Sequence, residues 1–425
     1  MDVKAVPTRS RDADVSLASR DDALPYLAAV LDDDRLSELV GENIRITRVR
    51  YKPRTSVLVA FCHTGKGTEN YGWALTSTTS GYSKLHGRAQ RSANDGGGIR
   101  LVCPDPRRRD AVVAIGGFED DWALRKNLGW LRGLGLDRLG SVRRAGQPFL
   151  NGAARVLRYI PECRLVLLEP TRGGPIVIRT AAGPVPDDER MLLRRLELHG
   201  VPVLRRLGDA DCSRHGISAS PAWGGHDLSA GEDPQAARLA GEALAVLHGV
   251  PVEAQPDPAE DAKDLLRQLT ANRDMVAALL PALADPAAKV AARIYRRLAG
   301  RAGHGAAVVV HGDFSADQVL VGGSEVRLID FDRSHPGTSD ADLGSFAAVE
   351  EMSLWRGPAD GPRGSHTDYL LEGYVRAGGV ITPAAVDAWT AFRMFTGAVD
   401  PFRNRSPDWA TDMARHIDRA SELVP

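Results

Sequence analysis

The chain has 425 residues, of which 43% are hydrophobic and 26% are charged, and its formal net charge at pH 7 is −1. These values are typical of a globular protein with room for two or three domains. The balanced charge gives no reason to expect nucleic acid or an anionic membrane as a partner, and no apolar run reaches the roughly 20 residues of a membrane span.

The N-terminal third of the chain is expected to form a cap domain. Residues 1–20 are polar and charged, so we expect a flexible leader without the apolar core of a signal peptide. Residues 21–145 combine segments of helical periodicity with β-rich segments, which predicts an α/β domain. The expected helices span 24–39, 83–91 and 120–133, and the expected strands span 44–51, 56–62, 71–75, 99–102 and 111–115.

A second β-rich stretch begins near residue 153 and repeats the first at an offset of 108 residues. Arg50-Tyr51-Lys52-Pro53 is echoed by Arg158-Tyr159-Ile160-Pro161, and Val57-Leu58-Val59 is echoed by Leu165-Val166-Leu167. Because Arg-Tyr-x-Pro is a short pattern, chance similarity between two hairpins and a true internal duplication are equally open.

The rest of the chain divides into a small β-rich lobe and a larger helical lobe. Residues 146–224 form the first, and residues 225–425 form the second, in which helical periodicity dominates. The expected elements are a hairpin at 156–169, a strand at 175–179 and helices at 187–198, 236–248 and 261–299.

The most informative motif lies in the helical lobe, where two acidic loops each follow an apolar run. His311-Gly312-Asp313 follows Val308-Val309-Val310, and Asp330 follows Val326-Arg327-Leu328-Ile329. Two short strands therefore deliver both loops to one place. Kinases that transfer a nucleotide γ-phosphate need one carboxylate as a base, and a second carboxylate with a side-chain carbonyl oxygen to hold Mg²⁺. The spacing assigns Asp313 as base and predicts Asp330 and Gln318 as Mg²⁺ ligands.

The combined motif resembles the aminoglycoside phosphotransferase (APH) family of small-molecule kinases. Family members carry His-Gly-Asp-x-x-x-x-Asn or Gln, followed by Ile-Asp and an aromatic residue. Gln318 and the string at 401–409 resemble the maltokinase-like actinobacterial branch. The resemblance covers about 150–425, whereas residues 1–140 are only weakly similar to the N-terminal cap of maltokinase-like members.

This resemblance implies an α+β, protein-kinase-like two-lobed fold with an N-terminal α/β cap domain. Residues 146–224 would be the nucleotide-binding N-lobe, and residues 225–425 the helical C-lobe with the catalytic loop, metal loop and substrate site. His311 is expected to brace the catalytic loop rather than to do chemistry. Asp342 resembles a family aspartate whose expected role is to cap a helix or brace a loop.

The expected nucleotide contacts include one departure from the family pattern. Arg179 occupies the strand position where such kinases have the Lys of Val-Ala-Ile-Lys. Either Arg179 contacts phosphates directly, or it is exposed and groups such as Arg158 or Arg172 hold the nucleotide. Glu189 or Glu197 of the following helix would pair with the cation, but not both, because eight residues place them two turns apart.

Substrate contacts are expected from the helices that follow Asp330. Acidic residues there would suit an amine or polyol, although ordinary surface charge explains any single one equally well. The candidates are Glu350, Glu351, Trp355, Asp368, Arg393, Asp400 and Arg403.

The sequence therefore predicts a Mg²⁺-dependent kinase that moves the γ-phosphate of ATP or GTP to a hydroxyl group of a sugar, amino sugar, aminoglycoside or nucleoside-type antibiotic. The alternative, motivated by Arg179 and Gln318, is a catalytically weak nucleotide-binding regulatory protein (pseudokinase) of the same fold. Widely spaced cysteines without a Cys-x-x-Cys pair predict free thiols and a cytoplasmic location. The acceptor and the oligomeric state are left open.

Overall fold

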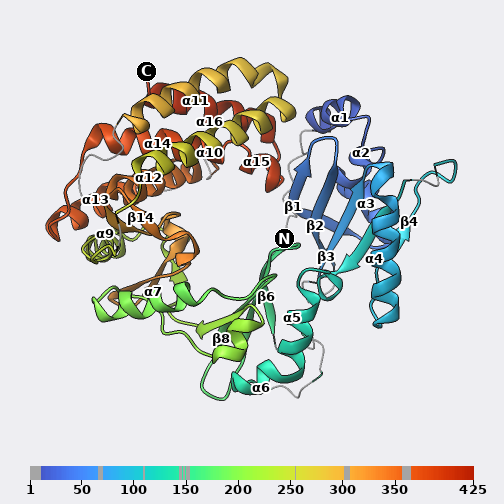
Figure 1. The fold of residues 1–425 in the computed structure, drawn as a ribbon, viewed down its shortest axis with the longest axis horizontal. Coiled ribbons are helices and arrows are strands. Elements are labelled where there is room, and N and C mark those ends of the chain that lie inside the picture. Colours follow the sequence, from blue (N-terminus) through green and yellow to red (C-terminus); the bar gives the residue numbers. More distant parts are fainter. Residues whose placement is uncertain are drawn as a thin grey trace, which may run out of the picture. The chain divides into compact units, whose positions relative to one another are not determined.

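The computed structural model describes residues 11–65, 70–108, 111–142, 146, 149, 154–253, 255–300, 307–356 and 365–425. The chain forms two compact units (Figure 1). The first unit comprises residues 1–186, 205–222 and 400–410, and the second comprises 187–204, 223–399 and 411–425. This division differs from the predicted domains, because the expected cap and most of the expected N-lobe share one unit.

The first unit begins with an antiparallel sheet, called here the first sheet, in the order β1-β2-β3-β5-β4. Strand β2 is buried along almost its whole length, which requires cover on both faces of the sheet. The elements of this region are α1 (Arg11–Arg20), α2 (Leu27–Leu31), α3 (Asp33–Val40), β1 (Ile44–Lys52), β2 (Ser56–His63), β3 (Tyr71–Ser77), α4 (Tyr82–Asn94), β4 (Arg100–Val102) and β5 (Val113–Gly117).

Two expected helices differ in the structure. The predicted helix at 24–39 is divided into α2 and α3 at Asp32, because the Asp32 side chain accepts hydrogen bonds from the backbone N–H groups of Asp34 and Arg35 and so caps α3. The predicted helix at 120–133 does not end at Gly133. It begins as α5 (Arg125–Trp130) and continues through a π-helical turn into α6 (Leu136–Arg138).

The prediction of a flexible leader over residues 1–20 is wrong for residues 11–20, and residues 1–10 lie outside the described residues. Residues 11–20 form α1, whose Leu17 is buried. Asp14 of α1 accepts hydrogen bonds from the guanidinium of Arg405, at 3.1 and 2.5 Å, and from the indole of Trp409, at 3.2 Å. This buried ion pair fixes α1 within the first unit.

The same contacts explain why residues 400–410 belong to the first unit and not, as predicted, to the helical lobe. The segment contains α15 (Asp400–Arg403), and the Phe402 ring contacts Tyr51 of β1 edge-on at 6.2 Å. Phe402 also packs on Trp409 at 5.0 Å. Buried aromatic packing therefore joins a segment from near the C-terminal end of the chain to the first sheet.

The second sheet of the first unit is antiparallel, in the order β6-β7-β8-β9. It forms where the second β-rich stretch predicts strands. Its elements are β6 (Arg155–Ile160), β7 (Arg164–Glu169), β8 (Ile176–Ala181), α8 (Ala210–Arg214) and β9 (Ile217–Pro221).

Both sheets have the same unusual turn after their first strand. Arg54 and Glu162, which lie 108 residues apart, are non-glycine residues with φ values of 54° and 58°. A buried aspartate holds each turn. Asp21 accepts from the Tyr51 hydroxyl at 2.7 Å and the Arg54 N–H at 2.8 Å.

In the second sheet, the corresponding carboxylate is that of Asp121. It accepts from the Tyr159 hydroxyl at 3.0 Å and the Glu162 N–H at 2.7 Å. The two aspartates begin the similar strings Asp21-Asp22-Ala23-Leu24 and Asp121-Trp122-Ala123-Leu124. These shared contacts favour duplication over chance similarity between two hairpins.

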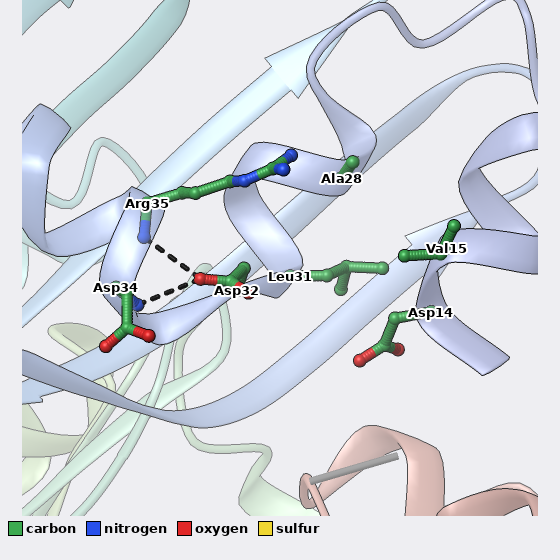
Figure 2. A pocket seen from close by; sticks show the side chains of 7 residues that line it. All are labelled: Asp14, Val15, Ala28, Leu31, Asp32, Asp34 and Arg35. Carbon is green, nitrogen blue, oxygen red and sulfur yellow. Dashed lines mark hydrogen bonds between the residues drawn. The ribbon is translucent and has the colours of Figure 1, made fainter. Parts of the chain in front are cut away.

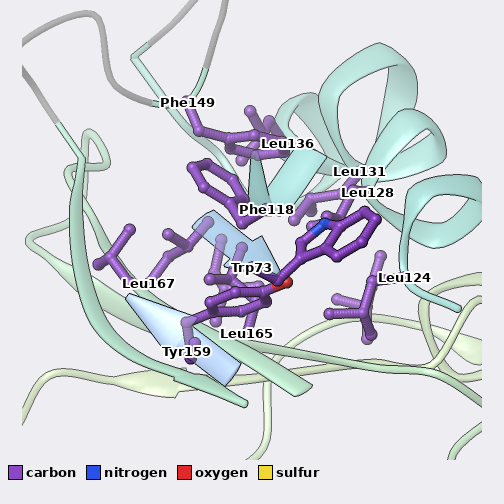
Figure 3. Close-up of a cluster of buried hydrophobic side chains, with 14 of the residues drawn as sticks. Trp73, Phe118, Leu124, Leu128, Leu131, Leu136, Phe149, Tyr159, Leu165 and Leu167 are labelled. Atoms are coloured by element: carbon purple, nitrogen blue, oxygen red, sulfur yellow. The ribbon is translucent and has the colours of Figure 1, made fainter. Parts of the chain in front are cut away.

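A hydrophobic core lies between the two sheets of the first unit (Figure 3). Trp73 comes from β3 of the first sheet, Leu165 and Leu167 come from β7 of the second, and Leu124 and Leu128 come from the α5 region. The α5 region is therefore packed against side chains of both sheets.

The second unit is mainly helical and contains two small antiparallel sheets, β10-β12-β13 and β11-β14. Its elements are α7 (Asp187–Leu198), β10 (His226–Asp227), α9 (Pro234–His248), α10 (Pro258–Leu279), α11 (Ala284–Ala299), β11 (Val308–Val310), β12 (Val319–Gly322), β13 (Glu325–Leu328), β14 (His335–Gly337), α12 (Ser339–Arg356), α13 (His366–Arg376), α14 (Pro383–Gly397) and most of α16 (Trp409–Leu423).

Helices α9 and α13 pack closely against each other in this unit. A Cβ atom at Gly241 would lie 2.0 Å from the Leu370 carbonyl oxygen, and one at Gly373 would lie 2.0 Å from that of Arg238. Glycine at both positions therefore allows the two helix backbones to touch. Within the described part of the chain, no helix is long and apolar enough to cross a membrane.

Candidate active site

The predicted catalytic loop begins directly after β11 in the second unit. Strand β11 pairs with β14, with Val310 opposite His335, so residue 311 begins beside the segment that precedes β14. His311 is fully buried, and its Nε2 lies 2.8 Å from the carbonyl oxygen of Ile329. It thereby joins the catalytic loop to the predicted metal loop. With no solvent exposure, the His311 side chain makes a contact that braces one loop against the other.

Gly312 allows these two loops to approach closely. Its φ is 83°, and a Cβ atom there would lie 2.2 Å from the carbonyl oxygen of Arg333. Any other residue would be strained by both the backbone conformation and the contact. This explains His-Gly-Asp in physical terms, because glycine brings Asp313 against the segment that follows Asp330.

Asp342 accepts hydrogen bonds from the backbone of the predicted catalytic loop. Its carboxylate accepts from the N–H groups of His311, at 2.6 Å, and Gly312, at 2.9 Å, and it lies 3.1 Å from Nε2 of His248. Burial raises the pKa of the Asp342 carboxyl, but the hydrogen bonds and charge of His248 outweigh burial and lower this pKa below its usual range. The Tyr374 hydroxyl lies 2.8 Å from the other ring nitrogen of His248. Asp342 thus has the loop-bracing contacts expected from the sequence.

The predicted metal ligands meet at one end of the β12–β13 hairpin. Val319 is opposite Leu328, and the Ile329 N–H donates to the backbone oxygen of Gln318 at 3.1 Å. Gln318 precedes β12, and Asp330 follows β13 by two residues. Asp330 has a φ of 65°, a strained value for a non-glycine residue of the kind that recurs at functional sites.

This pair of side chains fits Mg²⁺. The cation prefers hard oxygen ligands and keeps several waters, so one carboxylate and one carboxamide oxygen are enough. The Gln318 side-chain nitrogen donates to Asp317 at 3.4 Å. Asp330 and Gln318 would hold the ion beside the adjoining loop, which carries Asp313, the predicted base.

Asp313 lies between two guanidinium groups. Its side chain is 34% exposed, and its oxygens lie 3.2 Å from Arg393 of α14 and 3.6 Å from Arg333. The sequence named Arg393 as one candidate among several and gave no contact for it. The pairing depends on how α14 packs, and no local pattern indicates it.

Glu350, predicted to contact substrate, is used within the protein. It is buried and accepts from the N–H groups of His366 and Thr367, both at 2.6 Å, and it pairs with the His366 ring at 2.8 Å. Burial raises the pKa of Glu350, but hydrogen bonds from His366 and Thr367 lower it below its usual range. The hydrogen bond to Glu350 raises the pKa of His366. The ion pair fastens the first turn of α13, which corrects the predicted substrate role.

The other predicted substrate residues have similar structural partners. Glu351 accepts from the guanidinium of Arg419 at 2.7 and 3.3 Å. The Trp355 ring lies 4.3 Å from the guanidinium of Arg415. Arg403 pairs with Asp400 at 3.2 Å, and both belong to the first unit. The described ion pairs of these residues do not include Asp313, so the structure does not join them to the base.

The predicted nucleotide residues lie on the second sheet. Arg158, Val166, Arg179 and Ser218 stand opposite one another across β6, β7, β8 and β9, and are called here the Arg179 row. Directly opposed residues of antiparallel strands point to the same face, so Arg158 and Arg179 share a face about 10 Å apart. Leu165 and its neighbours on the other face are buried in the core, whereas Arg179 is half-buried.

The predicted partners of Arg179 lie on α7 in the second unit. Glu189 is in the first turn of α7 and half-buried, and Glu197 is near its last turn and exposed. Pairing of either with Arg179 stays a prediction.

A shallow depression of about 240 Å³ lies elsewhere, in the first unit (Figure 2). Two of its acidic residues have structural roles, since Asp14 pairs with Arg405 and Asp32 caps α3. Its lining contains none of the predicted site residues. The lining residues are Asp14, Val15, Ala28, Leu31, Asp32, Asp34 and Arg35.

Comparison with known proteins finds one matching family model. The model described as "Phosphotransferase enzyme family" (APH) matches residues 166–395, which include both catalytic strands and the Arg179 row from β7 onward. No curated protein matches the chain.

Several solved structures are similar to the chain. A spectinomycin phosphotransferase solved with ADP and spectinomycin is 12% identical over 64% of this chain and 92% of its own, with a TM-score of 0.47. A putative aminoglycoside phosphotransferase from Ralstonia eutropha is 17% identical over 71% of this chain and 98% of its own, with a TM-score of 0.48. A putative fructosamine-3-kinase from Thermobifida fusca is 18% identical over 64% of this chain and 93% of its own, with a TM-score of 0.44.

Proposed function

This chain belongs to the APH phosphotransferase enzyme family, and from that premise we propose that it transfers the γ-phosphate of ATP or GTP to a hydroxyl group of a small molecule. The observation that carries the proposal is the meeting of two loops. His311 and Gly312 bring the loop of Asp313 against the segment after Asp330, and the β12–β13 hairpin brings Gln318 beside that segment. These are the groups that phosphoryl transfer needs in one place.

In the proposed reaction, Asp313 accepts the proton of the acceptor hydroxyl. The freed oxygen forms a bond to the γ-phosphorus, the bond from that phosphorus to the β-phosphate oxygen breaks, and the nucleoside diphosphate leaves. Mg²⁺ held by Asp330 and Gln318 would neutralise charge on the phosphate oxygens. His311, Gly312 and Asp342 keep the base in place, so that the hydroxyl is oriented before it loses its proton.

We place the nucleotide phosphates at the Arg179 row. Arg158 and Arg179 share a face of the second sheet, and an arginine fork suits bidentate contact with phosphate oxygens. Arg179 stands where related kinases have Lys, so the positive charge is kept while the geometry of the contact with phosphate changes.

The acceptor proposed from the sequence is a sugar, amino sugar, aminoglycoside or nucleoside-type antibiotic, which would place the chain in sugar metabolism or antibiotic resistance. Placement in the maltokinase-like branch is part of the same proposal and rests on Gln318 and residues 401–409. A cytoplasmic location is also part of it and rests on the widely spaced cysteines. The alternative, a pseudokinase, predicts that the protein binds nucleotide but forms no phosphorylated product.

A nucleotide-consumption screen over these acceptor classes tests the proposal. Asp313→Asn is expected to lower kcat by about 10²–10⁴-fold while nucleotide affinity is kept, because only the proton acceptor is lost. Asp418→Asn, which changes an exposed aspartate of α16, is the matched control and should be neutral. Turnover that persists undiminished in Asp313→Asn would contradict the base assignment. Tight nucleotide binding without any product would favour the pseudokinase.

A further inference from the structure

The charge around Asp313 points to the chemical class of the acceptor. Two guanidinium groups, those of Arg333 and Arg393, are the cations that pair with Asp313 among the described residues. These three groups alone, one carboxylate and two guanidinium groups, carry a net charge of plus one. An acceptor hydroxyl that donates to Asp313 would therefore bring its neighbouring groups beside arginine side chains.

The acidic residues expected to balance this charge are occupied elsewhere. Glu350 is buried under the first turn of α13, where it pairs with His366. Glu351 pairs with Arg419. Both carboxylates are neutralised by these partners, so the positive charge beside Asp313 stays uncompensated by the residues that the sequence offered for an amine-binding site.

Arg393 has one hydrogen-bond donor without a partner among the described residues. Its Nη2 atom faces Asp313, while its Nε is buried and has no hydrogen-bond partner among the described residues. Its side chain is only 25% exposed, so its charge is weakly screened by water. Arg333 is 67% exposed and can swing toward a ligand. An unsatisfied buried donor costs free energy unless a ligand group accepts from it.

We propose that Arg393, assisted by Arg333, makes this site select a hydroxylated anion, an acceptor with a carboxylate or phosphate group close to the hydroxyl that is phosphorylated. The inference rests on the proposed function and deepens it. The anionic group would accept from Arg393, draw that guanidinium partly away from Asp313, and leave the base free for the hydroxyl. A cationic acceptor would meet like charge at the same place, which disfavours it.

This inference differs from the substrate class that the sequence suggested. Acidic side chains after Asp330 suited an amine, but the structure withdraws Glu350 and Glu351 from the site and puts arginines beside the base. The discrimination is therefore expected to depend on Arg393 itself.

Two acceptor series with matched carbon frames test the inference. Glucuronate, glucose and glucosamine form one series, and glycerate, glycerol and serinol form the other, each running from anion through neutral to cation. In the wild-type protein, kcat/KM is expected to be at least about tenfold higher for the anion than for the cation in at least one series. A wild-type preference for the amine in both would overturn the inference.

Arg393→Gln is expected to lower the anion-to-cation ratio of kcat/KM by about tenfold or more, and Arg393→Lys to keep part of it. Arg376→Gln, which removes an exposed arginine of α13 that pairs with Glu242 of α9, is the control and should leave the ratio unchanged. If Arg393 only held Asp313 in place, Arg393→Gln would lower kcat for all acceptors alike and leave the ratio unchanged, which would also overturn the inference.

Calorimetric binding of the same compounds separates this inference from the proposed function. If no compound is phosphorylated, the proposed function fails, and binding still measures selectivity. Anion binding that is weakened about tenfold in Arg393→Gln would support the inference. Equal binding of anion and cation, or no binding of either, would overturn it.

Discussion

The two sheets of the first unit share a turn and differ in the use of one face. In the first sheet, Arg50, Leu58, Leu75 and Ala114 stand opposite one another and are called here the Arg50 row. It is the counterpart of the Arg179 row, because Arg50 and Leu58 lie 108 residues before Arg158 and Val166.

Leu75 stands where the second sheet has Arg179, and it is buried with Leu58 and Ala114 in the core that includes the α5 region. Arg179 is half-buried on a face that this core does not use. Equivalent strands can therefore supply either a packing face or a ligand face. Whether a sheet face serves packing or ligand binding depends on two things. One is whether a helix covers that face, and the other is whether the central residue of the face is apolar, as Leu75 is, or charged, as Arg179 is.

The largest expected effect comes from placing the charge of the second sheet in the first. Leu75→Arg would bury an unpaired guanidinium in the core, so we expect the free energy of unfolding to fall by about 3–5 kcal/mol. Urea denaturation measures the loss. Leu75→Met is the control and should cost under about 1.5 kcal/mol. A stable Leu75→Arg protein would show that the two faces are interchangeable.

The next effect separates the two turn-holding aspartates. Oδ2 of Asp121 accepts from Tyr159 and Glu162, and Oδ1 accepts from the Ala123 N–H at 3.0 Å. Asp121→Asn must therefore lose at least one buried hydrogen bond, and we expect a cost of about 2–3 kcal/mol by thermal or urea unfolding.

Asp21→Asn is the matched variant in the first sheet, and it should cost only about 1 kcal/mol. Oδ1 of Asp21 has no hydrogen-bond partner among the described residues, so an amide nitrogen can take its place without breaking a bond. Equal costs for the two variants would contradict this difference between the turns.

A smaller effect is expected for Arg179→Leu, which gives the second sheet the residue of the first. We expect nucleotide affinity to fall about tenfold, or about 1.4 kcal/mol, because a charged contact with phosphate is lost. Unfolding free energy should change by about 1 kcal/mol or less. In the first sheet, Arg50 is the counterpart of Arg158. Arg50→Leu removes that cation and should leave nucleotide affinity unchanged. Equal effects of the two variants on nucleotide binding would remove the distinction between the sheets.

The smallest effect concerns the two strained turn residues. Arg54→Gly relieves a positive φ and keeps the N–H that donates to Asp21, while its exposed pair with Asp22 is worth little. Because glycine also gains entropy in the unfolded chain, we expect a net stabilisation of only about 0.5 kcal/mol.

Glu162→Gly should give no such gain, because Glu162 pairs with Arg50 and Arg88. Calorimetric melting of both variants checks the contrast. A larger gain for Glu162→Gly would show that these pairs contribute nothing.

Local patterns predicted most elements and failed at a local helix cap and at a distant contact. Strands β6, β7 and β8 form where β-branched alternation predicts them. The helix expected at 24–39 is broken because Asp32 caps a new helix, which periodicity alone does not register. Residues 11–20 looked polar enough for a loose leader, yet Arg405 and Trp409 hold them through Asp14.

The sequence by itself determined the family. It also predicts the chemical type of the site, because the defining residues lie on adjoining loops within a short stretch of chain. Spacing between Asp313, Gln318 and Asp330 is set by two short strands and their connection, so it can be read without the fold.

Only the tertiary structure decided which charges surround Asp313, the proposed base. Arg393 reaches Asp313 because α14 packs within the helical unit, and Glu350 is withdrawn because it holds the first turn of α13. These partners come from separate helices, and the distances between helices depend on packing of the whole unit. The partner of a charged residue is fixed only by such packing. Acidic residues were expected around the proposed acceptor site, but the structure places Arg333 and Arg393 beside Asp313.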